Sequence, residues 1–332
     1  MQNNTTASFN VAIGVDALYT NTTGAENVAV GAGALDANTT ASNNTAVGGQ
    51  NALGANTTGA QNTAIGGGAL AANTTASNST SVGHASLIRN TTGASNVAVG
   101  VDALNFNTTG ANNTAVGSYC LDANTTAANN VAVGYGALTA NTTGAENTAM
   151  GTLALGANTT ASNNTAVGRA ALAANTTGEQ NTAVGSAAGD AVTTGRNVSA
   201  FGFNALTAVT TGANNTGLGV GAGQTIASGS DNIAVGYLAD CAHDSANSIT
   251  IGVGITGQGD YFKFGKASNI VSNQFTADAS WSQSSDERLK KNIADSTLGL
   301  SFINALRTVK YNWKPSHELD STDSELAHLY KE

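Results

Sequence analysis

A short apolar segment that ends in glycine recurs along most of the chain, as in NVAVG at residues 27–31 and NTAVG at residues 44–48. Successive glycines of this kind are 17 residues apart, except for one step of 18 after Gly48 and one of 16 before Gly252. They are Gly14, Gly31, Gly48, Gly66, Gly83, Gly100, Gly117, Gly134, Gly151, Gly168, Gly185, Gly202, Gly219, Gly236 and Gly252. A constant period of this size predicts a repeat protein in which each repeat stacks on its neighbours.

The alternation inside each segment predicts a β-strand. In NTAVG, Thr45 and Val47 fall on one face and Ala46 on the other, which is a period of two. The glycine that follows is expected to turn the chain, because glycine adopts positive φ without a steric penalty. An Asn-Thr-Thr triplet, as at residues 38–40, keeps the same period and predicts a second turn whose asparagine bonds to nearby backbone.

The repeat length predicts the fold class. Seventeen residues are too few for a pair of helices and suffice for two short strands and two turns, and an Ala-Leu pair such as Ala34 and Leu35 recurs in step. We therefore predict an all-β chain in which residues 1–256 form a β-solenoid or β-roll. Its rungs would lie about 4.8 Å apart and carry ladders of Asn and Thr side chains.

The predicted core is lean, because aromatic residues make up only 5% of the chain. Each rung offers about one Val or Ile and one Leu, each worth roughly 1.5–3 kcal/mol when fully buried. Packing several copies side by side would bury more of the small residues. We therefore expect an oligomer, although the pattern does not fix the number of chains.

Charge and composition exclude several functions. The net charge is -9 and no basic stripe is present, so nucleic-acid binding lacks its electrostatic basis. No apolar run is long enough to span a bilayer, and we expect no membrane insertion. The repeats lack Asp-rich turns for calcium and paired carboxylates for glycoside hydrolysis, so no metal and no cofactor are expected. Cys120 stands where other repeats have alanine and is expected to be a small buried thiol.

The repeat pattern NTAVGxxALxxNTTG resembles the repeats of phage and marine viral tail fibres and, more distantly, the head repeats of trimeric autotransporter adhesins. Both families are trimeric, so the resemblance implies a homotrimer. It further implies a structural fibre of the virion tail that attaches to a host surface receptor, for which a glycan is one candidate. The module that joins such a fibre to the virion is not recognisable in this chain.

Two other functions remain open. A bacterial trimeric surface adhesin, placed extracellularly at the cell surface, would use the same coil. An ice- or mineral-binding solenoid would use stacked threonines, but adjacent pairs such as Thr22 and Thr23 point to opposite sides of an extended chain and form no flat double ladder.

Residues 257–284 form a junction in which the period fails and aromatic residues gather. We predict that these residues cap the solenoid and lock the chains together, because an exposed terminal rung is open to edge pairing. A sugar-stacking site is the alternative. The aromatic residues are Tyr261, Phe262, Phe264, Phe275 and Trp281.

Residues 285–332 differ in composition and hold seven of the twelve Lys and Arg residues. The motifs SSDERLKKNI at 284–293, LGLSFINAL at 298–306 and VKYNWKP at 309–315 resemble the intramolecular chaperone of phage endosialidases and tail spikes, a module also found in myelin regulatory factors. The resemblance implies a small α+β domain. Such a domain trimerises, assists folding of the upstream β-fibre and then releases itself by cleavage.

The resemblance also implies the residues of that cleavage. Ser285 would be the nucleophile, Lys290 its basic partner, and the bond between Ser284 and Ser285 the one that is cut. Lysine can act as the base only if its environment lowers its pKa from about 10.4, and the trimer would have to supply that environment.

Three further residues match the motif and are expected to position backbone: Asp286, Arg288 and Asn292. The family domain continues beyond the motifs present here, so we count residues 285–332 as its N-terminal part. We expect at most a single-turnover autoproteolysis, and none from these 332 residues alone.

Overall fold

The computed structural model describes residues 3–276 and 282–283. Backbone contacts divide the chain into two units, Met1–Ser284 and Ser285–Glu332, and the described residues belong to the first. Every regular element among them is a β-strand, and none is a helix. The all-β prediction is therefore confirmed for the solenoid.

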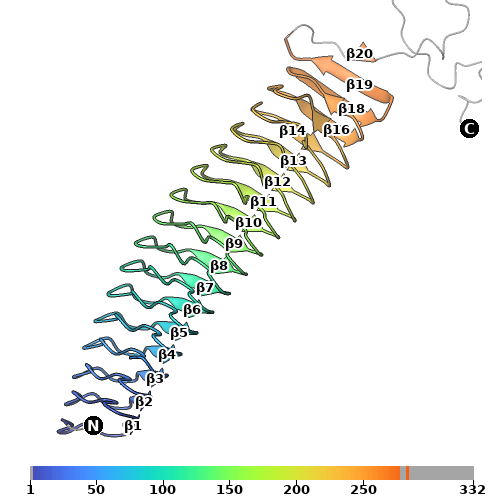
Figure 1. Cartoon of the computed structure of the whole chain (residues 1–332). Helices are drawn as coiled ribbons and strands as arrows, with labels where there is room; N and C mark the ends of the chain where they lie inside the picture. Colours follow the sequence, from blue (N-terminus) through green and yellow to red (C-terminus); the bar gives the residue numbers. More distant parts are fainter. Residues whose placement is uncertain (1–2, 277–281, 284–332) are drawn as a thin grey trace, which may run out of the picture. The chain divides into compact units, whose positions relative to one another are not determined.

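The strands are short and recur once per repeat (Figure 1). They are β1 (Val11–Ile13), β2 (Val28–Val30), β3 (Thr45–Val47), β4 (Thr63–Ile65), β5 (Thr80–Val82), β6 (Val97–Val99), β7 (Thr114–Val116), β8 (Val131–Val133), β9 (Thr148–Met150), β10 (Thr165–Val167), β11 (Thr182–Val184), β12 (Ser199–Phe201), β13 (Thr216–Leu218), β14 (Ile233–Val235), β15 (Asp240–Cys241), β16 (Ile249–Val253), β17 (Thr256–Gly257), β18 (Tyr261–Lys266), β19 (Asn269–Gln274) and β20 (Ser282–Gln283).

The repeats form a β-solenoid of about 15 turns, as the period predicts. Each strand from β1 to β14 pairs in parallel with the strand of the next rung, and equivalent residues face one another, as Val99 faces Val116. The series continues through β16 to β18. Insertion of one residue after Gly48 leaves the pairing of β3 with β4 in step.

The prediction of two strands per rung is wrong for most of the solenoid. Each rung has one strand of three residues, and only β15 and β17 form a second pair. The Ala-Leu segment is a turn, because residues on it adopt left-handed backbone, such as Asp102 at φ 54° and Leu104 at φ 52°. The turns still bond to each other from rung to rung: Leu104 N donates to Cys120 O at 2.9 Å.

The core consists mainly of alanine and leucine. Ala46, at the centre of β3, is fully buried, so the predicted alternation of strand faces is confirmed. The valines of the strands point outward, and their assignment to the core is wrong. The largest fully buried side chains are Leu18, Leu35, Leu53, Leu70, Leu87, Leu104, Leu121, Leu138, Leu155, Leu172, Leu206 and Ile226.

Buried asparagines form the predicted ladder on the turn side of the coil. In each Asn-Thr-Thr turn the asparagine amide bonds within its own rung and to the rung before. Asn38 Nδ2 donates to Ala41 O at 3.0 Å and to Asn21 Oδ1 at 2.9 Å. The first threonine of each triplet bonds to the next rung, as Thr22 Oγ1 does to Thr39 O at 3.0 Å. Rungs are thus joined by side chains as well as by backbone.

The glycine that ends each strand is required by close approach between rungs. Gly100 has φ 140°, and a Cβ placed on it would lie 2.5 Å from Gly117 O. A side chain at this position would therefore push neighbouring rungs apart, which explains why this column contains only glycine.

The C-terminal end of the coil is covered by a hairpin. β18 pairs in parallel with β16 and antiparallel with β19, and β19 pairs with β20. Phe262 and Phe264 lie with ring centroids 5.5 Å apart. Phe264 and Phe275 stay 40% and 49% exposed, and Trp281 lies outside the described residues.

Candidate functional site

The outer face of the sheet carries an unbroken apolar column, which we call the outer column. It consists of the third residue of each strand from β1 to β14 and of the residues of β16 and β18 that continue the same register, and the strand pairing places all of them next to one another. The column runs through Ile13, Val30, Val47, Ile65, Val82, Val99, Val116, Val133, Met150, Val167, Val184, Phe201, Leu218, Val235, Ile251 and Phe264.

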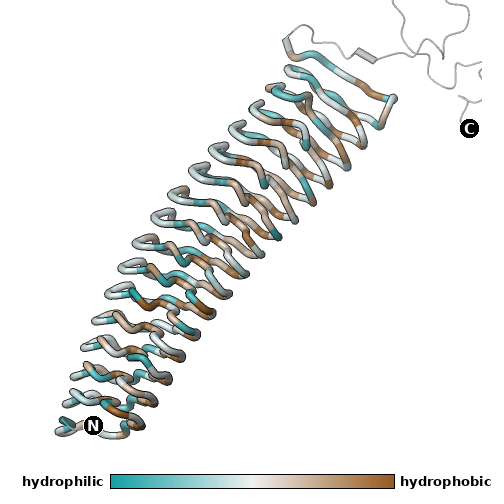
Figure 2. Tube along the Cα trace, viewed as in Figure 1, coloured by the Kyte–Doolittle hydropathy of each residue, from teal (hydrophilic) through white to brown (hydrophobic). Residues whose placement is uncertain are grey.

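The members of the outer column are exposed or half-buried in the single chain, and none of them is fully buried. Ile65 is 41% exposed, Met150 43% and Leu218 50%. Apolar residues recur along the strand edge of the coil in Figure 2. Parallel sheets are normally covered on both faces, and a long apolar patch on a soluble chain marks an interaction surface.

Besides the outer column, each strand has one other outward residue, which is threonine, valine or a similar β-branched residue in most rungs, as Thr114 and Val131 are. Neither outward position of β1 to β14 holds a charged residue. Apolar contact with a similar surface would therefore leave no buried charge without a partner.

Titratable groups inside the coil have their pKa values shifted by burial. Desolvation raises the pKa of the thiols of Cys120 and Cys241 above their ordinary value. Both thiols are free and fully buried, as expected for Cys120. Burial also raises the pKa of the Asp240 carboxyl, although Cys241 N donates to its Oδ1 at 2.8 Å.

Within residues 3–276 and 282–283, no group of three or more His, Cys, Asp or Glu side chains is placed to hold a metal ion. The same residues include no helix with the length and hydropathy needed to cross a bilayer.

The residues expected to carry self-cleavage lie outside the described residues. They are Ser284, Ser285, Asp286, Arg288, Lys290 and Asn292. Their roles stay predictions from the motif.

Comparison with known families bears on this C-terminal segment. The family model for the chaperone of endosialidase matches residues 285–328. The match begins at Ser285, the first residue of the second contact unit. No curated protein and no solved structure matches the chain.

Sequence reasoning missed the outer column as a surface. The signal was present, because a period of two that buries Ala46 must turn Thr45 and Val47 away from the core. Large apolar residues at this position, such as Phe201 and Met150, also fit an open surface better than the narrow interior of a coil lined by alanine.

Proposed function

We propose that this chain is the body of a homotrimeric attachment fibre, followed by an intramolecular chaperone that assembles it and is released by self-cleavage. The observation that carries the proposal is the family match over residues 285–328, which starts at the serine that the motif makes the nucleophile. Chaperone domains of this family occur in trimeric phage fibre proteins. A virion tail fibre that binds a host surface receptor is the role that fits best.

The outer column supports association of the chains. Burial of apolar surface contributes about 25 cal/mol per Å², so even the partial cover of each exposed valine adds up over the rungs. An isolated coil would leave this column in water. We propose that three copies pack through the outer column, and that the hairpin of β18 and β19 continues the contact through Phe264.

The chemistry proposed for release is an acyl shift followed by hydrolysis. Ser285 Oγ attacks the carbonyl carbon of Ser284 while the neutral amine of Lys290 takes the hydroxyl proton. The C–N bond breaks, the amino group of Ser285 leaves with a proton, and an ester joins the two parts. Water then hydrolyses the ester and frees the segment that begins at Ser285.

The test is the intact and oligomeric mass of the protein produced from its full gene, beside variants at the junction. The wild type should give a trimeric product ending at Ser284. Ser285→Ala should stay uncut and remain a trimer, and Lys290→Gln should be cut much more slowly. Ser284→Ala is the matched control, because it keeps the nucleophile and should be cut like the wild type. Cleavage of Ser285→Ala at the wild-type rate would contradict the assignment.

The ice-binding alternative finds no support in the threonine turns. Thr22 is half-buried and donates its hydroxyl to Thr39 O, and only Thr23 of the pair is exposed. The turn therefore presents one threonine column rather than a flat pair. The bacterial adhesin stays the second candidate, since the same coil and the same outer column would serve it.

A further inference from the structure

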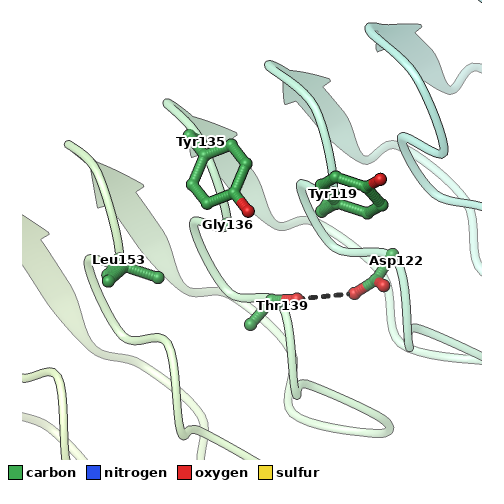
Figure 3. Close-up of a pocket in the computed structure, with 6 residues that line it drawn as sticks. All are labelled: Tyr119, Asp122, Tyr135, Gly136, Thr139 and Leu153. Carbon is green, nitrogen blue, oxygen red and sulfur yellow. Dashed lines mark hydrogen bonds between the residues drawn. The ribbon is translucent and has the colours of Figure 1, made fainter.

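A pocket of about 290 Å³ opens on the flank of three consecutive rungs (Figure 3). We call it the tyrosine pocket. It is lined by Tyr119, Asp122, Tyr135, Gly136, Thr139 and Leu153. None of these residues belongs to a strand, so the pocket lies beside the sheet and not on it.

The pocket exists because large and small residues alternate in one column of the coil. The second residue after the strand-ending glycine is Tyr119, then Gly136, then Leu153 in successive rungs. A Cβ on Gly136 would meet only Leu153 Cδ2, at 3.0 Å, so the space above Gly136 is otherwise open. Tyr119 and Leu153 form the two walls of a slot one rung wide.

The wall residues are kept at a backbone cost. Tyr119 has φ 59° and Leu153 has φ 57°, a left-handed conformation that disfavours bulky side chains by roughly 1 kcal/mol or more. Both side chains are also exposed, by 41% and 45%, so the core does not require them. Most other rungs place a smaller residue here, such as Gly33 or Ala187, although Leu238 shows that a bulky residue occurs once more.

Two tyrosine rings form a fixed corner over the slot. The rings of Tyr119 and Tyr135 lie edge to face, with centroids 5.8 Å apart and planes at 80°. Tyr135 is 57% exposed, so this contact leaves ring surface open to a ligand. An edge-to-face pair of this kind restrains both rings before any ligand arrives.

A polar pair lies at the other side of the slot. Thr139 Oγ1 donates to Asp122 Oδ1 at 2.7 Å, which orients the carboxyl group, as the dashed line in Figure 3 shows. The carboxylate accepts hydrogen bonds and does not donate them. Together with two phenol groups, the slot offers hydrogen-bond acceptors and donors next to aromatic and aliphatic surface.

This combination has the chemistry of a sugar site. A pyranose presents a C–H face that packs on an aromatic ring and a rim of hydroxyls that donate to a carboxylate. The lining contains one acidic and no basic residue, so an anionic sugar is disfavoured and a neutral one is favoured. The volume is near the lower end of ligand pockets and suits one or two sugar rings.

We propose that the tyrosine pocket binds a neutral hexose unit of a surface glycan, with Tyr135 stacked on the ring and Asp122 accepting from its hydroxyls. The inference rests on the attachment role proposed above and gives that role a ligand class and a place. Tyr119, Gly136 and Leu153 shape the slot.

The chain contains a natural control for the pocket. Asp190 and Thr207 stand in the same rung positions as Asp122 and Thr139, and Thr207 Oγ1 donates to Asp190 Oδ1 at 2.5 Å. In that place Asn204 occupies the position of Gly136, and Ala187 that of Tyr119. The polar pair is thus present there beside an exposed aromatic residue, Phe203 in the position of Tyr135, but without the glycine of the slot and without the second tyrosine.

The test is saturation-transfer NMR of the full chain with the methyl glycosides of glucose, galactose, mannose and N-acetylglucosamine. At least one should receive saturation at its ring C–H protons. Gly136→Asn, which copies a residue tolerated at position 204, should fill the slot and weaken binding at least tenfold. Tyr135→Ala and Asp122→Asn should do the same. Asp190→Asn should leave binding unchanged.

Three results would overturn the proposal: no saturation for any of the four sugars, binding that Gly136→Asn leaves intact, or a loss of oligomeric mass in Tyr135→Ala, which would make the pocket a contact between copies. Failure here is separate from failure of the fibre proposal. A chain that is trimeric and is cut before Ser285, but binds no sugar, would contradict the pocket alone.

Discussion

Asn175 Oδ1 is buried without a hydrogen-bond donor because Val192 stands one rung later where an asparagine stands in the preceding rungs. In those rungs the amide of each asparagine donates to the Oδ1 of the one before, and Asn175 Nδ2 still donates to Asn158 Oδ1 at 3.1 Å. The ladder therefore ends at Asn175. From Val192 onward the same column is filled by apolar residues, including Val209 and Ile226.

Breaking the ladder in its middle should cost more than shortening it at its end. Asn107 is bonded on both sides: its Nδ2 donates to Asn90 Oδ1 at 2.8 Å, and Asn124 Nδ2 donates to its Oδ1 at 2.7 Å. Asn107→Ala leaves two buried groups without these partners, at about 1–3 kcal/mol each. Asn175→Ala only moves the unpaired oxygen to Asn158. We expect a clearly lower thermal midpoint for Asn107→Ala than for Asn175→Ala, and equal midpoints would contradict the ladder.

Alanine should not be tolerated in place of Gly217, although most other strands have alanine at this position. Strand β13 has Gly217 where its neighbours have Ala200 and Ala234. A Cβ there would lie 2.7 Å from Leu206 Cγ and 2.9 Å from Ala222 O. Gly217→Ala should overpack the core and destabilise the chain by about 1–3 kcal/mol.

Gly49 gives the matched control for Gly217, because a Cβ on it meets nothing within 4 Å. Gly49→Ala should be neutral or slightly stabilising, since it restricts the unfolded chain. Chemical denaturation of the two variants beside the wild type measures both effects. A neutral Gly217→Ala would show that the coil relaxes around Leu206.

The Asp240 carboxyl should make stability fall as pH rises. Burial raises its folded-state pKa above the ordinary 3.8, so the folded chain holds this proton more tightly than the unfolded chain does. The stabilisation from the protonated form is fully present below pH 3.8 and is lost as pH rises through the folded-state pKa. Asp240→Asn keeps an oxygen for Cys241 N and removes this titration.

The difference in thermal midpoint between Asp240→Asn and the wild type isolates this group from the other carboxyls. The thermal midpoint of Asp240→Asn should rise relative to that of the wild type as the pH is raised from about 3 toward 7. A difference that shrinks over the same range would mean that the ionised carboxylate is the form the fold prefers.

The spacing of the glycines predicted the solenoid, and the alternation around Ala46 predicted that each strand has two different faces. The pattern placed the valines in the core, whereas they point outward. It did not predict the single strand per rung. That feature depends on Leu104 and its equivalents adopting left-handed backbone, which leucine propensity disfavours and only the stacking of complete rungs stabilises.

Of the candidate sites, one was predicted from the sequence and the other was not. Ser285 and Lys290 were predicted from a contiguous motif, which needs no knowledge of the fold. The tyrosine pocket joins residues from three rungs, and Tyr119 and Tyr135 become neighbours only when the rungs stack in step. The period predicts that the rungs stack in step, but it does not predict how side chains from different positions of successive rungs meet, as those of Tyr119 and Tyr135 do.

The central claim, that the outer column joins three chains, is tested most directly by the oligomeric mass of the full chain and of Val116→Asp. Thr126→Asp, on an exposed turn between β7 and β8, is the matched control with the same added charge. The account predicts a mass of three chains for the wild type and the control, and a smaller species for Val116→Asp, because a charge buried between chains has no partner. A trimer that Val116→Asp leaves intact, or a wild type that is a monomer, would contradict it.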